Sequence, residues 1–130
     1  MGRIVVPVTI TSALDPTHEI RCDALVDTGA YGLVLPMAWR SRLGGLPVAR
    51  TVELETADGR IVVGTVCGPV RIHLAGFDTI FGEVTFLGGA PESGVEALVG
   101  YTVLQQARAA VDMAHDRLVK VPHLDLKLAS

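Results

Sequence analysis

The chain has 130 residues, a length that suits one domain, and 49% of them are hydrophobic, which is enough to build a core. Its formal net charge is −3 and it has no basic run, which argues against nucleic acid and anionic membranes as partners. No uncharged run approaches the length of a membrane span, and no signal peptide is visible after Met1. We therefore expect a cytoplasmic protein.

The cysteines and histidines are too few and too scattered to indicate a metal centre. Cys22 and Cys67 are the only cysteines, and their spacing fits no zinc pattern. The four histidines occur singly. We therefore expect no metal and no cofactor. We interpret both cysteines as reduced thiols in or near the core, with a disulfide as the less favoured alternative.

The first half of the chain is predicted to form short strands separated by turns. Arg3 to Thr11 alternates apolar and polar residues, as a strand with one buried face does. Ser12 to His18 contains Asp15-Pro16 and is predicted to be a turn. The elements expected next are a strand from Glu19 to Val26, a short strand from Gly32 to Leu35, a short helix from Pro36 to Leu43 with Pro36 in its first turn, and a strand from Val48 to Glu55.

The second half continues the same pattern. Thr56 to Arg60 is predicted to be a hairpin turn, with Asp58-Gly59 as the turn pair. The elements expected after it are a strand from Ile61 to Leu74 with bulges or bends at Gly64 and Gly68-Pro69, a strand from Phe77 to Leu87, a loop from Gly88 to Gly94, a buried run from Ala97 to Gly100, a short helix from Tyr101 to Ala107, a hairpin of Ala109 to Met113 with Arg117 to Val121, and a terminal strand from Leu124 to Leu128. Many short strands without a βαβ rhythm predict an all-β barrel or sandwich with one or two short helices, as a single domain spanning residues 1–130.

One stretch of the sequence contains a candidate functional carboxylate. Ala24-Leu25-Val26 reads as the end of a buried strand, and Asp27-Thr28-Gly29-Ala30 follows it in a tight loop. A carboxylate in that position is costly to bury unless it is hydrogen-bonded or functional. The alternative for the tripeptide alone is an ordinary turn between two strands, because turns use Asp and Gly routinely.

A second stretch repeats the first. Ala97-Leu98-Val99-Gly100 echoes Ala24-Leu25-Val26-Asp27, and a short predicted helix follows it. With the Asp-Thr-Gly-Ala loop, the order of these elements resembles the retropepsin-like, retroviral-type aspartic proteases (clan AA), in which two such loops are related by pseudo-symmetry. The resemblance runs from about Ile4 to about Val121. Because no viral polyprotein context or signal peptide is present, the chain looks most like the bacterial single-domain members.

The resemblance implies an aspartic endopeptidase that works as a homodimer on peptide or protein substrates. Hydrolysis by carboxylates needs two of them around one water, one to take its proton and one to polarise the carbonyl. This chain has one candidate, Asp27, because no other aspartate has both the apolar approach and the Thr-Gly that follows. A two-fold dimer would place two copies of Asp27 at its axis.

The resemblance also implies roles for neighbouring residues. Asp27 would be the catalytic acid and base, Thr28 would hold the two loops together across the dimer, Gly29 would let the backbone approach the substrate, and Ala30 would pack behind. The second loop would be Leu98, Val99 and Gly100. The substrate-covering flap would be the hairpin tip Thr56, Ala57, Asp58, Gly59 and Arg60, for which a plain exposed hairpin is the alternative. Both chain ends would pair between subunits.

The chain departs from the viral pattern in two places. The hairpin tip lacks the glycines and isoleucines familiar from viral flaps, and five glycines between Gly76 and Gly94 lengthen the late loops. Substrate preference is therefore open. The alternative function is a non-catalytic domain of the same fold that serves in dimerisation or peptide binding, and an accidental motif on an unrelated β-barrel is the third possibility.

Overall fold

The computed structural model describes residues 3–56, 58–88 and 97–122. These residues form nine strands and two short helices: β1 (Val5–Ser12), β2 (Glu19–Val26), β3 (Leu33–Pro36), the 3-10 helix η1 (Met37–Leu43), β4 (Val48–Glu55), β5 (Ile61–Leu74), β6 (Thr79–Leu87), β7 (Leu98–Val99), α1 (Tyr101–Ala107), β8 (Ala109–Asp112) and β9 (Arg117–Lys120). Within them no helix has the length and hydropathy to cross a bilayer.

Six strands close into a barrel, so the predicted all-β fold is confirmed. The sheet order is β1-β2-β7-β3-β6-β5-β4, and an additional pairing of β1 with β5 closes the ring and leaves β4 outside it. β5 makes this possible because it changes partner along its length. Its residues 61–67 pair with β4, and Val70 to Leu74 pair with β1. The register shift against β6 between Cys67 and Val70 lies where the partner changes, so Gly68-Pro69 marks a bulge as predicted.

The barrel interior is aliphatic, as the scarcity of aromatic residues requires. On β1 the alternating Val6, Val8 and Ile10 are buried, which confirms the predicted face. The largest fully buried side chains are Phe86, Ile10, Ile20, Leu33, Leu35, Leu43, Ile72, Leu74, Val66, Val70, Val84 and Val99. Burying each such side chain contributes roughly 1.5–3 kcal/mol to folding. Trp39 of η1 packs partly buried against this cluster, as a packing residue.

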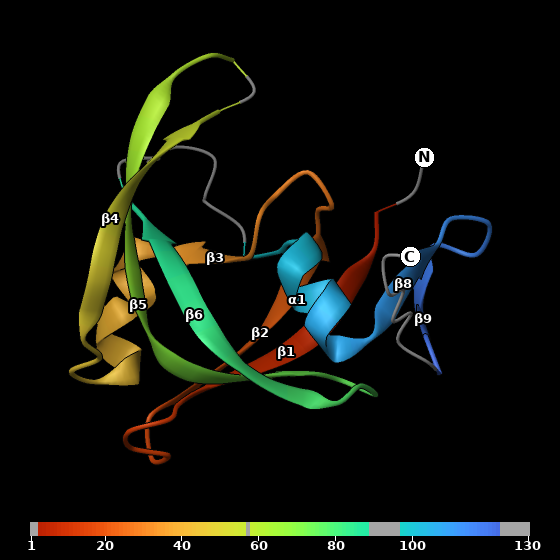
Figure 1. The fold of residues 1–130 in the computed structure, drawn as a ribbon, viewed down its shortest axis with the longest axis horizontal. Helices are drawn as coiled ribbons and strands as arrows, with labels where there is room; N and C mark the ends of the chain where they lie inside the picture. The colour runs from red at the N-terminus through yellow and green to blue at the C-terminus, as the bar shows by residue number, and fades with distance from the viewer. Residues whose placement is uncertain (1–2, 57, 89–96, 123–130) are drawn as a thin grey trace, which may run out of the picture.

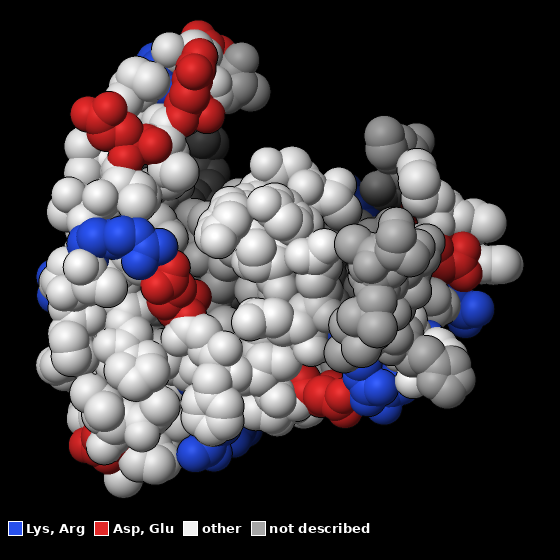
Figure 2. Space-filling view, in the orientation of Figure 1, with Lys and Arg blue, Asp and Glu red and all other residues white. Residues whose placement is uncertain are grey.

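The β4–β5 hairpin extends beyond the barrel, on the side where the loop between β2 and β3 also lies (Figure 1). The two strands pair in register from Arg50↔Val66 to Glu55↔Ile61. Figure 2 shows acidic side chains gathered toward the tip of this hairpin, where Glu53, Glu55 and Asp58 are exposed, whereas the surface over α1 carries no charge.

β7 holds the centre of the fold together. It lies between β2 and β3, parallel to β2 through Leu25↔Leu98 and Val26↔Val99, and antiparallel to β3. Gly100 follows it and crosses the chain that leaves β2. A Cβ at Gly100 would lie 2.4 Å from the Ala30 carbonyl oxygen and 2.6 Å from the Gly32 nitrogen, so only glycine fits this crossing.

The β8–β9 hairpin is a separate two-stranded sheet, joined to the barrel at its base. α1 ends at Arg108, which has φ 56°. The Arg108 guanidinium donates to the Asp78 carboxylate at 2.6 and 3.1 Å, and the Arg108 carbonyl accepts from the Val121 N–H at 2.8 Å. This arginine therefore ties the hairpin to the turn before β6 (Figure 1).

Three details of the predicted elements are wrong for identifiable reasons. The helix from Pro36 is a 3-10 helix that begins at Met37, and Pro36 precedes it in an extended conformation as the last residue of β3. Gly64 is no bulge: it pairs in register with Val52 and Leu87, and a Cβ there would lie 2.7 Å from Thr85 Cγ2, so close packing explains the glycine. Phe77 and Asp78 are not part of the strand: they follow a turn at Ala75-Gly76, which the Phe77 N–H closes by donating to the Leu74 carbonyl at 2.9 Å, and β6 begins at Thr79.

Two predicted segments cannot be compared with the structure. Most of the loop from Gly88 to Gly94 and all of the strand from Leu124 to Leu128 lie outside the described residues.

Replacing Gly100 with alanine should destabilise the protein by about 3 kcal/mol, because the new methyl group meets backbone atoms that cannot rotate away. Urea unfolding measures the change. Gly45→Ala is the matched control, since a Cβ there meets nothing within 4 Å. Equal stability of the two variants would contradict the close approach of the backbone at Gly100.

Asp78→Asn should lower the urea midpoint at about pH 7, and the difference from the wild-type protein should shrink as the pH falls below 3.8. The hydrogen bonds from Arg108 hold the pKa of Asp78 below its ordinary value of 3.8. A lowered pKa in the folded state stabilises the protein above the ordinary pKa, and this contribution is lost as the pH falls through the lowered value. Asp23→Asn, on the exposed side of β2, should show no such difference. A midpoint difference that persists in acid would show that the carboxylate charge is not the cause.

Candidate active site

Asp27 lies directly after β2, in a loop that its own backbone and side chain help to shape. The Asp27 N–H donates to the Val99 carbonyl at 3.0 Å, which continues the β2–β7 pairing. The Ala30 N–H donates to the Asp27 carbonyl at 3.0 Å and closes a turn. The Gly29 N–H donates to the Asp27 Oδ1 atom at 3.0 Å. The carboxylate therefore has a fixed orientation.

Asp27 lines a cavity that is open to solvent. Asp27 is half-buried, and Thr28 and Gly29 are exposed. The cavity beside them has a volume of about 560 Å³. Its lining residues come from the N-terminal segment, the end of β2, the Asp27 loop and the β8–β9 hairpin: Arg3, Ile4, Leu25, Val26, Asp27, Thr28, Val111, Met113 and Asp116. A carboxylate on a mostly apolar wall can hold a water, but one carboxylate supplies only half of an acid–base pair.

The two loops that the sequence indicated are in contact. The chain from Ala30 to Gly32 is hydrogen-bonded to the start of α1: the Ala30 carbonyl accepts from the Tyr101 N–H at 3.0 Å, and the Gly32 carbonyl accepts from the Gly100 N–H at 2.9 Å. Between them the Tyr31 carbonyl accepts from both the N–H and the hydroxyl of Thr102, at 3.0 and 2.7 Å. The Asp27 loop is thus fixed to the helix on one side and to β7 on the other.

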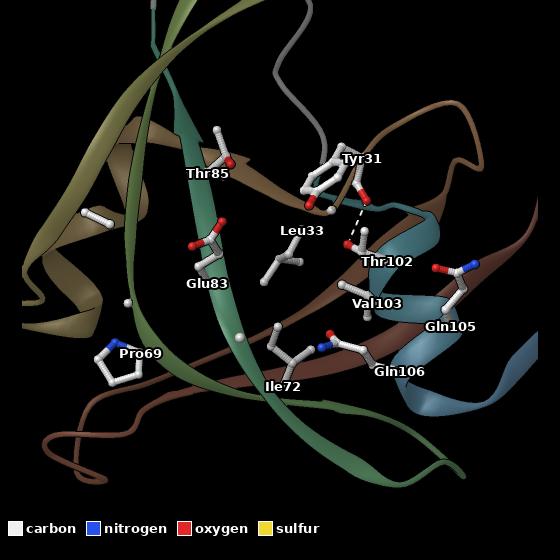
Figure 3. Close-up of a pocket in the computed structure, with 14 residues that line it drawn as sticks. Tyr31, Leu33, Pro69, Ile72, Glu83, Thr85, Thr102, Val103, Gln105 and Gln106 are labelled. Atoms are coloured by element: carbon white, nitrogen blue, oxygen red, sulfur yellow. Dashed lines mark hydrogen bonds between the residues drawn. The ribbon is translucent and has the colours of Figure 1, made fainter. Parts of the chain in front are cut away.

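A second cavity lies behind this loop and was not anticipated from the sequence. Its volume is about 630 Å³, and it separates α1 from β5 and β6 (Figure 3). Its floor is formed by the buried Leu33, Ile72 and Val103. The labelled polar side chains around it are Tyr31, Glu83, Thr85, Thr102, Gln105 and Gln106.

Three features of the second cavity explain its shape and charge. Gly82 lies on its wall, and a Cβ there would meet only Ile72 Cδ1 at 3.5 Å, so the missing side chain leaves space. The Arg50 guanidinium binds the Glu83 carboxylate through both terminal nitrogens, at 2.5 and 3.1 Å, and this pairing raises the pKa of Arg50. The Tyr31 ring packs edge-on against Tyr101 at 5.6 Å. The only signal for this cavity in the sequence was the glycines that line it, Gly32, Gly68 and Gly82. Glycines indicate turns equally well.

The tip of the β4–β5 hairpin is held by local hydrogen bonds, and its described residues do not line the Asp27 cavity. The Thr56 N–H donates to the Arg60 carbonyl at 2.8 Å, and Gly59 has φ 86°, which confirms the predicted turn. The Thr56 hydroxyl donates to Asp58 and, with Arg60 at 3.1 Å, holds the pKa of Asp58 below its ordinary value. Ala57 lies outside the described residues.

The described residues offer no alternative metal or thiol chemistry beside Asp27. No group of three potential metal ligands occurs in residues 3–56, 58–88 and 97–122. Cys22 and Cys67 are both free, Cys67 is buried, and burial raises the pKa of the Cys22 thiol. Neither cysteine lines the Asp27 cavity.

Comparison with known proteins supports the fold rather than a particular relative. No protein-family model and no curated protein matches the sequence. Among solved structures, EIAV protease complexed with the inhibitor HBY-793 matches with a TM-score of 0.57 and 22% identity over 81% of this chain and 88% of that one. A retropepsin-like aspartic protease from Rickettsia conorii matches with a TM-score of 0.46 and 18% identity over 87% and 95% of the two chains. The chain therefore has the all-β retropepsin fold of the retroviral-type aspartic proteases.

Proposed function

We propose that the protein is an aspartic endopeptidase in which two copies of Asp27, one from each subunit of a homodimer, activate a water molecule between them. The observation that carries this proposal is the position of Asp27. Its carboxylate accepts from the Gly29 N–H, its backbone is bonded to β7 where β2 ends, and Asp27 lines a cavity that is open to solvent. The retropepsin fold around it supports the same function.

The reaction needs the two carboxylates in different protonation states. The ionised one accepts a proton from the water, whose oxygen then forms a bond to the carbonyl carbon of the peptide. The protonated one donates its proton to the carbonyl oxygen, so that the tetrahedral intermediate carries no net new charge. In the collapse of this intermediate, the carboxyl that took the water's proton donates it to the amine nitrogen as the C–N bond breaks. One hydroxyl of the intermediate gives its proton to the other carboxylate, so that a carboxylic acid forms and the pair returns to its starting state.

The other described aspartates are poorly placed to supply the second carboxylate within one chain. Several are already engaged in exposed hydrogen bonds or ion pairs with neighbours: Asp15, Asp58, Asp78 and Asp112. Asp116 lines the Asp27 cavity but lies in the exposed turn of the β8–β9 hairpin with φ 52°. A second subunit is the simpler source, because symmetry gives its carboxylate the same loop and the same orientation.

The residues after Asp27 fit supporting roles. The exposed Thr28 hydroxyl is available to bond the partner loop, and Gly29 leaves the face of the carboxylate uncovered, since a Cβ there would lie 3.2 Å from Asp27 Oδ1. The β4–β5 hairpin would cover an extended peptide, which such hairpins bind through main-chain hydrogen bonds. Substrates are therefore unfolded or flexible protein segments.

Asp27→Asn should reduce cleavage of unfolded casein by about a thousandfold or more and leave the urea midpoint unchanged. The amide keeps the shape of the carboxylate but cannot exchange the proton that the reaction requires. Asp23→Asn, four residues earlier on β2, is the matched control and should retain full activity. Activity that survives in Asp27→Asn would refute the carboxylate pair, whereas loss of folding would identify Asp27 as structural.

Specific activity should fall on dilution, because each subunit holds half of the catalytic pair. Well below the dimer dissociation constant the dimeric fraction is proportional to concentration, so a tenfold dilution should lower specific activity about tenfold. Mass measurement in solution over the same concentrations shows whether the loss follows dissociation. A constant specific activity in a monomeric protein would exclude the shared site.

A further inference from the structure

The cavity between α1 and the strands β5 and β6 takes no part in the proposed reaction. Its volume is about 630 Å³, which lies within the range of about 300–1,000 Å³ that small-molecule sites occupy. The described residues that line it are all different from those that line the Asp27 cavity. Tyr31 lies at one end of it and Ile72 at the other (Figure 3). A ligand held there would be distinct from the peptide bond that is cleaved.

Gly82 keeps this cavity open although its own backbone does not require glycine. Its φ lies outside the left-handed region, and a Cβ there would meet only Ile72 Cδ1, at the ordinary contact distance of 3.5 Å. Gly64 on the neighbouring strand is different, since a Cβ there would lie 2.7 Å from Thr85 Cγ2. Glycine in a strand interior lowers stability and often marks a place where a ligand approaches closely. The space beside Gly82 is therefore better explained by what fills it than by the fold.

The cavity is polar but carries no net charge. Glu83 is the only charged residue among the described residues that line it, and both of its carboxylate oxygens accept from the Arg50 guanidinium, at 2.5 and 3.1 Å. An anionic ligand would find no unpaired cation in this lining, and a cationic ligand would find no unpaired carboxylate. A neutral ligand with hydroxyl groups fits this pair best, because hydroxyls can donate to the lone pairs that remain on the two Glu83 oxygens.

Two further polar side chains at the cavity have unused hydrogen-bonding groups. Within the described part of the chain, neither the Thr85 hydroxyl nor the Gln106 amide has a hydrogen-bond partner. Figure 3 shows the Gln106 amide directed from α1 toward β6, which carries Glu83 and Thr85. Hydroxyls and amides both donate and accept, so they match ligand groups that do the same. A purely apolar ligand would exclude water and leave these groups without partners, which is costly.

The remaining surfaces suit the apolar parts of a sugar. The floor consists of the buried Leu33, Ile72 and Val103, which an apolar substituent such as a methyl group can cover. At the rim, the Tyr31 side chain is 64% exposed, and its ring packs edge-on against Tyr101 at 5.6 Å. An aromatic ring in a fixed orientation is a platform for the C–H face of a sugar ring, since both surfaces are apolar and rigid.

We propose that this cavity binds a neutral carbohydrate unit that carries an acetamido group, an N-acetylhexosamine. The sugar ring stacks on Tyr31, and its hydroxyls bond to Glu83 and Thr85. The acetamido methyl group covers the apolar floor, and the acetamido amide bonds to Gln106. The site is separate from the Asp27 cavity, and the proposal does not depend on the peptidase activity proposed above.

Titration of the isotope-labelled full chain with the disaccharide N,N′-diacetylchitobiose tests the site by NMR. We expect saturable shifts of the Gln106 side-chain amide and of the backbone amides of Tyr31 and Gly82, with a dissociation constant of about 1 mM or lower. Maltose has hydroxyls but no acetamido groups, and it should bind at least about tenfold more weakly. Insoluble chitin, a polymer of the same unit, is the second arm: retention on chitin identifies a polymer as the source, and binding of the disaccharide alone identifies a free sugar.

Gly82→Leu should abolish binding of the disaccharide, because the added side chain would extend from the wall into the cavity. Gly45→Leu is the matched control, since a Cβ there meets nothing within 4 Å and Gly45 does not line the cavity. Gln106→Ala, at an exposed position of α1, should keep the wild-type urea midpoint and raise the dissociation constant at least about tenfold. Asp27→Asn should bind the disaccharide with the wild-type affinity, because the two cavities share no described lining residue.

Two results would overturn the sugar site. The first is a wild-type protein without saturable shifts, and the second is binding that survives both Gly82→Leu and Gln106→Ala. Casein cleavage then identifies the other candidate occupant, an extended part of a peptide substrate. A raised KM for casein in Gly82→Leu, in a protein that binds no disaccharide, would assign the cavity to the substrate path. An inactive wild-type protein that binds the disaccharide would instead contradict the peptidase and support the sugar site.

Discussion

The close crossing of two backbone segments beside β7 is the constraint on which the rest of the structure depends. The chain leaving β2 and the chain leaving β7 pass within hydrogen-bonding distance, so that carbonyls of Ala30, Tyr31 and Gly32 accept from residues 100–102. The absence of a side chain at Gly100 permits this approach. The crossing fixes the Asp27 loop mainly through main-chain hydrogen bonds, to which the Thr102 hydroxyl and the Asp27 carboxylate each add one. The Asp27 carboxylate accepts from the Gly29 N–H within its own loop, and Asp27 lines an open cavity.

The barrel supplies the rigidity that this crossing needs. β7 has two residues and could not persist alone, but it pairs with β2 on one side and β3 on the other, and both strands are anchored in the aliphatic core. The partner change in β5 at Gly68-Pro69 lets the ring close while its first half continues outward with β4. One long strand thus belongs to both the closed barrel and the extended hairpin, which makes the hairpin a continuation of the barrel wall.

The sequence carried enough information for the order of the elements and for the position of Asp27, because both depend on local patterns. Alternation marks β1, apolar runs mark the ends of β2 and β7, and Asp58-Gly59 marks the hairpin turn. The 3-10 character of η1 and the reason for Gly64 were not readable, since they depend on which side chains of other strands lie nearby. The cavity behind Tyr31 was missed for the same reason. Its walls come from five elements, β3, β4, β5, β6 and α1, and no spacing in the chain connects Gly82 with Gln106.

The β8–β9 hairpin shows how an element outside the barrel can be held rigidly beside Asp27. Its base is fixed by the bonds of Arg108 to Asp78 and by the buried Ala107 and Ala109, and Val111 lines the same cavity as Asp27. Under the proposed mechanism, the second carboxylate has to lie within hydrogen-bonding distance of the same water, because proton transfer requires positions accurate to a few tenths of an ångström. The ion pair of Arg108 with Asp78 does not line the cavity, yet it fixes the base of the hairpin that borders it, so residues remote from Asp27 would contribute to that geometry.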